Sequence, residues 1–119
     1  MRASRGEIKI EEILQEAGLH FEEEYIFPNL VSSSGRPLRF DFAVFEDNGD
    51  IDFLIEFQGI QHYEPVEIFG GEKQFKIQQE HDKRKREYAM NNNIKLLEIP
   101  YWDFDNVEEI LSRELGLTA

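Results

Sequence analysis

The chain has 119 residues, no cysteine and a formal net charge of −12. The length suits one compact domain with a real core, the lack of cysteine excludes disulfides and thiolate zinc sites, and no apolar run approaches the roughly 20 residues of a membrane span. The acidic charge argues against DNA binding by a basic surface alone, and two interpretations stay open: a solvated acidic face, or carboxylates clustered to hold a divalent cation.

The N-terminal part predicts a helix and then a short strand. Ser4-x-x-Glu7 is a capping box, in which the serine side chain bonds the backbone of the third helical residue. Apolar residues then recur at helical spacing, so we expect a helix over residues 5–17 that stops at Gly18. Residues 20–26 mix aromatic and acidic side chains, which indicates a short edge strand.

A β-hairpin is predicted in the middle of the chain. Residues 38–45 and 51–58 alternate apolar and polar side chains, and Asn48-Gly49 lies in the turn between them. Strict alternation places Phe40, Phe42 and Val44 together on one face of the first strand.

The C-terminal part predicts a long polar helix over residues 72–90, a buried strand over 94–99, a loop over 100–104 and a last amphipathic helix over 107–115. The order α-β-β-β-α-β-α favours an α/β fold with a mixed central sheet and helices on its faces. No domain boundary is visible, so we expect a single domain over residues 1–119, which can be part of a longer protein.

Asp41 and Glu56 are carboxylates in the middle of the two hairpin strands. Each taken alone is explained equally well as an exposed residue of a half-solvated strand. The hairpin makes their strands neighbours, and alternation puts both side chains on one face, where paired carboxylates suit Mg²⁺. Gln58 shares the face of Glu56 and adds an amide.

Three further residues have an ordinary and a functional interpretation. Glu7 completes the capping box or adds a carboxylate to the metal site. His62, just past the end of a strand, is a surface residue or a proton carrier at neutral pH. Asp82 pairs with Lys85 or Arg86 on its own helix, or orients His62.

The run Lys83-Arg84-Lys85-Arg86 is the only basic block of the chain. It is a solvated helix face, or a short patch that contacts DNA phosphates and positions the duplex without reading its sequence. We expect DNA contacts from Gln61, Lys83, Lys85 and Arg86.

Several motifs stand in a characteristic order: Ser4-Arg5-Gly6-Glu7, Arg39-Phe40-Asp41-Phe42, the run from Ile55 to Pro65, Phe69-Gly70-Gly71, His81-Asp82-x-x-Lys85 and the run from Asn93 to Tyr101. Over residues 4–111 this arrangement resembles the catalytic domains of phage-type homing endonucleases, which are related to very-short-patch repair endonucleases. These belong to the EDxHD branch of the PD-(D/E)XK nuclease superfamily. The resemblance implies a restriction-endonuclease-like αβββαβα core.

The resemblance also implies the site residues. Glu7, Asp41, His62 and Asp82 match the named positions of the branch, and Glu56 matches the variable one. It implies Mg²⁺, for which Mn²⁺ can substitute, held by Asp41 and Glu56, and His62 as general base or acid positioned by Asp82. The superfamily's usual lysine is replaced by Gln58, which lacks a positive charge, and this leaves open whether Gln58 is catalytic.

The expected function is therefore metal-dependent hydrolysis of phosphodiester bonds in double-stranded DNA. Two alternatives remain: an inactive nuclease-fold interaction module, motivated by the acidic charge and the missing lysine, and a mismatch- or junction-specific nickase. Cutting both strands with one site per chain favours a homodimer. The acidic balance suggests a separate DNA-binding domain on another segment or subunit, and the location expected is cytoplasmic, in a bacterial host if a phage encodes the chain.

Overall fold

The computed structural model describes residues 4–117, and within them the fold is mixed α/β. Three α-helices and four strands follow the predicted order, with 3-10 turns between them. Their bounds are α1 Arg5–Glu16, β1 His20–Val31, β2 Pro37–Phe45, β3 Ile51–Gln58, α2 Gly71–Asn91, β4 Lys95–Pro100 and α3 Val107–Glu114. The expectation of a mixed sheet with helices on its faces is confirmed.

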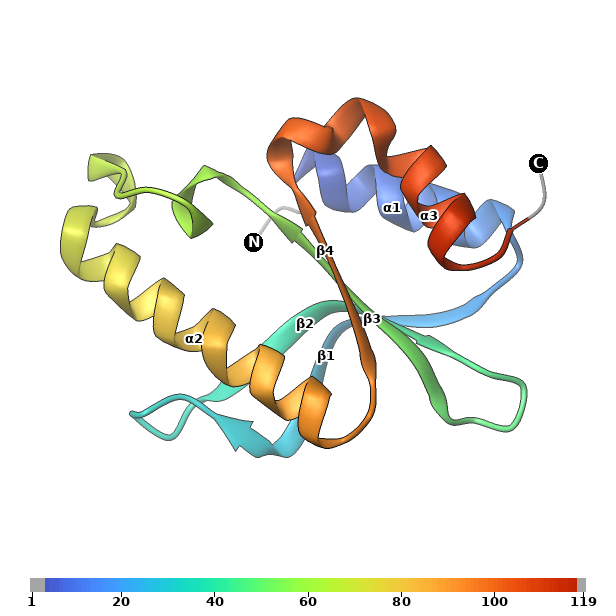
Figure 1. The fold of residues 1–119 in the computed structure, drawn as a ribbon, viewed down its shortest axis with the longest axis horizontal. Coiled ribbons are helices and arrows are strands. Elements are labelled where there is room, and N and C mark those ends of the chain that lie inside the picture. The colour runs from blue at the N-terminus through green and yellow to red at the C-terminus, as the bar shows by residue number, and fades with distance from the viewer. Residues whose placement is uncertain (1–3, 118–119) are drawn as a thin grey trace.

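The sheet has the strand order β1-β2-β3-β4. The first three strands form an antiparallel meander, and β4 pairs with β3 in parallel after the crossover through α2. Helices α1 and α3 lie together on one side of the twisted sheet, and α2 lies on the other (Figure 1). No helix of residues 4–117 combines the length and the apolar character that crossing a membrane requires.

Each face of the sheet has its own apolar core. Under α1 and α3, Ile10 and Leu111 pack with Ile55 and other inward residues of β2, β3 and β4. Under α2, Ala89 packs with Leu54 and residues of β1 and β2. Because the centre of β3 is covered on both faces, the side chains of Glu56 and Gln58 are buried and need partners.

Two expectations about the first strands are wrong. The strand β1 is 12 residues long, not a short strand over residues 20–26, because it pairs with β2 as far as Val31. Phe40 and Phe42 do not share a face: Phe40 packs under α2 and Phe42 under α1 and α3. The alternation of β2 changes beside Glu24, which has a left-handed backbone (φ 52°) in the facing part of β1. Such a conformation is uncommon for a residue other than glycine.

Candidate active site

Asp41 lies where β2 and β3 separate. Their ladder extends from the turn to the pair Phe42–Ile55, and beyond it the Oδ2 of Asp41 accepts a hydrogen bond of 2.8 Å from the backbone N–H of Phe57. The carboxylate therefore takes the place of a strand partner for this N–H. This bond holds Asp41 at the mouth of the gap between the strands.

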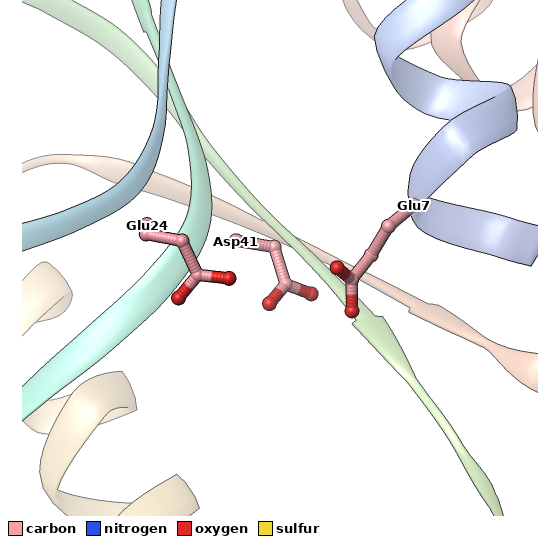
Figure 2. Close-up of side chains that lie close together, drawn as sticks. All are labelled: Glu7, Glu24 and Asp41. Atoms are coloured by element: carbon pink, nitrogen blue, oxygen red, sulfur yellow. The ribbon is translucent and has the colours of Figure 1, made fainter. Parts of the chain in front are cut away.

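Glu7 and Glu24 converge on Asp41. Carboxylate oxygens from all three residues lie within 4.8 Å of one another. Figure 2 shows Asp41 between Glu24, which comes from β1, and Glu7, which reaches down from the first turn of α1. Sequence reasoning missed Glu24, because alternation along a single strand does not reveal which of the three consecutive acids at 22–24 turns toward β2.

Local structure at the start of α1 brings Glu7 into this cluster. Ser4 caps the helix, and its side chain accepts a hydrogen bond of 3.2 Å from the backbone N–H of Glu7, as the capping box predicts. Gly6 is buried against Phe57 of β3, so closely that a Cβ at this position would lie 2.3 Å from the aromatic ring. A glycine is required here because only a bare backbone allows this approach.

Two members of the acidic cluster, Asp41 and Glu7, have raised pKa values. Burial, and then the negative charge of Glu56, raise the pKa of Asp41 to about 8, although the Phe57 N–H opposes this. Burial, together with the charges of Asp41 and Glu24, raises the pKa of Glu7 to about 7. Because the carboxylates repel one another when ionised, a cation between them would be stabilising.

The oxygen donors of Glu7, Glu24 and Asp41 fit a divalent cation such as Mg²⁺ or Mn²⁺. Glu56, the second predicted metal ligand, lies close enough to Asp41 for its charge to raise the pKa of that carboxyl, and its Oε1 lies 2.5 Å from the ammonium nitrogen of Lys85, with both side chains largely buried. The three carboxylates that converge within 4.8 Å are those of Glu7, Glu24 and Asp41, and the role of Glu56 as a metal ligand stays a prediction.

The position of Lys85 therefore does not match the predicted one, which was a helix surface that contacts DNA phosphates. Its side chain is 13% exposed and lies over the ring of Phe40, with the ammonium between α2 and β3. Its position places a positive charge beside the strand acid. From the resemblance, such a charge would come from a lysine at position 58, where the chain has the neutral Gln58.

His62 and Asp82 are brought together as predicted. The Nδ1 of His62 lies 2.9 Å from the Oδ2 of Asp82, and Gln78 donates to the Oδ1 of the same carboxylate at 3.0 Å. The His62 side chain is 11% exposed, and it does not line the groove above Asp41. Asp82 thus orients the imidazole, while the groove itself receives a different histidine, His81.

Gln58 and Arg86 belong to a separate network, in which Gln58 is buried and Arg86 is exposed. The Oε1 of Gln58 accepts a bond of 2.6 Å from the Tyr63 hydroxyl, and its amide nitrogen donates to Glu98. Arg86 donates hydrogen bonds of 2.8 and 2.9 Å to the carboxylate of the same Glu98. The structure does not bring Gln58 to the acidic cluster, and it does not leave Arg86 free for phosphate.

The other two predicted DNA contacts lie outside the site. Lys83 is exposed and sits 4.0 Å from Glu87 on its own helix. Gln61 lines a separate cavity of about 240 Å³ between the turn after β3 and the start of α2. Neither residue touches the acidic cluster.

A groove of about 700 Å³ runs past the acidic cluster, between α2 and the hairpin of β1 and β2. Glu7, Glu24 and Asp41 line one part of it, and Lys85 and His81 line it from α2. The lining also includes Arg36 and three serines of the hairpin loop, Arg39 and its neighbours on β2, and Ile77 and Gln78 of α2. This groove is the concave surface where the titratable groups of the site meet a potential ligand.

Comparison with known proteins adds little to this geometry. Uncharacterized protein 094L of Frog virus 3 (isolate Goorha) is 47% identical to the chain over 49 residues, which is 40% of the chain and 32% of that protein. The match thus covers about a third of the relative's length. No protein-family model and no solved structure matches the chain.

Proposed function

We propose that the chain is the catalytic domain of a metal-dependent DNA endonuclease with a restriction-endonuclease-like fold, of the homing type that its motifs resemble. The observation that carries the proposal is the meeting of Glu7, Glu24 and Asp41 at one point of an open groove, next to the buried pair of Glu56 and Lys85. The element order and the sheet order are compatible with that fold.

Each residue has a role that its environment supports. Glu7, Glu24 and Asp41 would hold Mg²⁺ or Mn²⁺, which supplies an activated water and stabilises negative charge on the phosphate. Lys85 contributes a fixed positive charge at the groove, where charge develops on the phosphate oxygens during attack. Glu56 keeps the ammonium in place through its 2.5 Å contact.

His62 is the proposed proton carrier, held through Nδ1 by Asp82. A carboxylate on one imidazole nitrogen fixes the tautomer and leaves the other nitrogen to exchange a proton with the leaving oxygen or the water. Because His62 does not line the groove of the free protein, its part in the reaction requires DNA to approach the end of β3.

Nicking of supercoiled plasmid DNA tests the proposal. The wild-type chain is expected to convert the plasmid to open-circular or linear form with Mg²⁺ or Mn²⁺ and not with EDTA. Asp41→Asn and Glu24→Gln should abolish or strongly reduce conversion. Glu22→Gln is a matched control, because Glu22 lies on the same strand with its side chain exposed and outside the cluster.

A second candidate, an inactive interaction module on the same fold, is favoured by the net charge of −12 and by the engagement of Lys85 and Arg86 in buried or paired contacts. Calorimetric titration with Mn²⁺ separates the two. The nuclease proposal expects binding that Asp41→Asn removes and Glu22→Gln preserves. If the wild-type protein neither binds Mn²⁺ nor nicks the plasmid, the inactive interaction module is the better explanation.

A further inference from the structure

Three of the four cations in the predicted basic run of α2 are held by other groups, and the fourth, the exposed Lys83, lies outside the groove. Lys85 is paired with Glu56 at 2.5 Å, and Arg86 is held by Glu98 at 2.8 Å. Arg84 bonds Glu80 at 2.8 Å and the backbone carbonyl of Val31 at 3.1 Å. The exposed Lys73, Lys76 and Lys83 of α2 do not line the groove, and Lys85 is paired, so cations that hold a polyanion inside the groove must come from another element.

The hairpin of β1 and β2 supplies such cations, with Arg36 in its loop and Arg39 on β2. Arg36 and Arg39 line the same groove as the acidic cluster. Among residues 4–117 no carboxylate lies within ion-pair distance of Arg36, which is exposed. Arg39 has a single partner, Glu24, at 3.9 Å, and both side chains are more than half exposed. An exposed pair this long is worth little, so the Arg39 guanidinium remains available.

Hydrogen bonds fix the hairpin that carries these arginines. The backbone N–H of Ser32 bonds the Arg36 carbonyl at 2.8 Å, and the buried Ser32 hydroxyl contacts the Ser34 hydroxyl at 2.9 Å. Two contacts from α2 fasten the hairpin to the helix: Arg84 to the Val31 carbonyl, and the Tyr88 hydroxyl to Asn29 at 2.8 Å. A tip that is fixed by hydrogen bonds loses little conformational entropy when a ligand binds.

The groove therefore carries carboxylates and, beside them, the guanidinium groups of Arg36 and Arg39, of which Arg39 makes only the exposed 3.9 Å contact with Glu24. Guanidinium groups match phosphate oxygens in geometry and charge, and they remain charged at any working pH. A phosphodiester strand could place one phosphate at the acidic part, where a cation would neutralise it, while a neighbouring phosphate meets the arginines. A small anion would not use both parts.

We infer that Arg36 and Arg39 form the phosphate-binding element of the protein, which seats the backbone of duplex DNA in the groove beside the acidic cluster. The inference rests on the proposed nuclease function for its choice of polyanion. It moves the expected DNA contact from the surface of α2 to the hairpin of β1 and β2.

Binding measured apart from cleavage tests this inference. Fluorescence anisotropy with a labelled duplex oligonucleotide, in Ca²⁺ and at increasing KCl, gives the affinity and its salt dependence. For Arg36→Gln with Arg39→Gln we expect about a tenfold or greater loss of affinity at low salt, and a slope of log K against log[KCl] that is shallower by about 1.8, since each lost phosphate contact removes about 0.9.

Lys73→Gln with Lys76→Gln is the matched control. Both lysines are exposed on α2 outside the groove, and the pair carries the same change in charge. The control should keep the wild-type slope. The inference is overturned if the arginine variant keeps the wild-type affinity and slope, if the control loses as much, or if the wild-type protein shows no salt-dependent binding.

Plasmid nicking distinguishes failure of the inference from failure of the proposed function. If nicking depends on Asp41 but is unchanged in the arginine variant, the proposed nuclease function is supported and the phosphate-binding role of the arginines is contradicted. Duplex binding that depends on the arginines, without nicking by the wild-type chain, supports the element and contradicts the nuclease.

Discussion

The ammonium nitrogen of Lys85, on α2, lies 2.5 Å from the Oε1 of Glu56, in the middle of β3. Glu56 is 5% exposed, and burial alone would make its ionised carboxylate very costly. The pair accounts for an acidic side chain in the covered centre of a sheet. It also brings a positive charge within reach of Asp41, whose pKa Lys85 lowers slightly against the stronger effects of burial and Glu56.

Removing one member of this pair should destabilise the fold more than removing both. Lys85→Met leaves the Glu56 carboxylate buried without a partner, and we expect the free energy of unfolding to fall by roughly 3–5 kcal/mol. Adding Glu56→Gln should recover part of the loss, because the uncompensated charge disappears. Urea denaturation of the two single variants and the double variant measures this coupling. Lys83→Met, at an exposed position, is the control, and we expect it to lower the free energy of unfolding by about 0.5 kcal/mol at most. A decrease for Lys85→Met that is no larger than this would contradict the buried pair.

The stability of the metal-free protein should fall as pH rises from about 4 to about 8. Asp41 has an ordinary pKa of 3.8 and a pKa of about 8 in the fold, so the folded state binds a proton that the unfolded state has lost in this range. The charged groups that face it are Glu7 on α1, Glu24 on β1, Glu56 on β3 and Lys85 on α2. The carboxylates oppose its ionisation, and Lys85 favours it.

Urea unfolding in EDTA across this pH range checks the sign. Stability should be greatest near the acidic end, decline through neutrality and level off above about pH 8. Asp41→Asn should flatten much of the decline, and Asp52→Asn, an exposed acid of β3, should not. A wild-type stability that rises steadily with pH would show that Asp41 is ionised in the free protein.

Substituting Gly6 by alanine should destabilise the protein, although alanine normally favours a helix by about 1 kcal/mol over glycine. The added Cβ would lie 2.3 Å from the ring of Phe57, so α1 or the ring must move. Overpacking of this kind costs about 1–3 kcal/mol. Thermal unfolding measures the effect, with the exposed Glu12→Ala of the same helix as the control. Calorimetry should also show weaker Mn²⁺ binding by Gly6→Ala, because Glu7 moves with the helix. An increase in stability would disprove the close contact.

Asp82→Asn should impair the proposed nuclease far more than its fold. An asparagine amide can donate to the Nδ1 of His62, and this favours the tautomer with the proton on the other nitrogen. We expect the single-turnover nicking rate to fall by roughly 10²–10⁴-fold, the usual contribution of a proton carrier. Nitrogen NMR of the imidazole should show the change of tautomer. Glu87→Gln, exposed on the same helix, is the control. An altered tautomer with an unchanged rate would remove His62 from the reaction.

Local periodicity was sufficient for the elements and for part of the site. The alternation of residues 51–58 and the Asn48-Gly49 turn predict the hairpin, and the hairpin makes the strands of Asp41 and Glu56 neighbours. The capping pattern at Ser4 predicts the start of α1. These features depend on residues close in the chain, so the sequence carries them directly.

The partners of the acidic residues depend on contacts between distant segments. Glu24 reaches Asp41 because its backbone is left-handed, and Lys85 reaches Glu56 because the crossover helix covers β3. The amide of Gln58 is likewise engaged by Glu98 on the neighbouring parallel strand. By itself the sequence determined which strands carry carboxylates. Only the tertiary structure decided which carboxylates meet and which one is neutralised, because burial and helix docking select among side chains that alternation leaves equivalent.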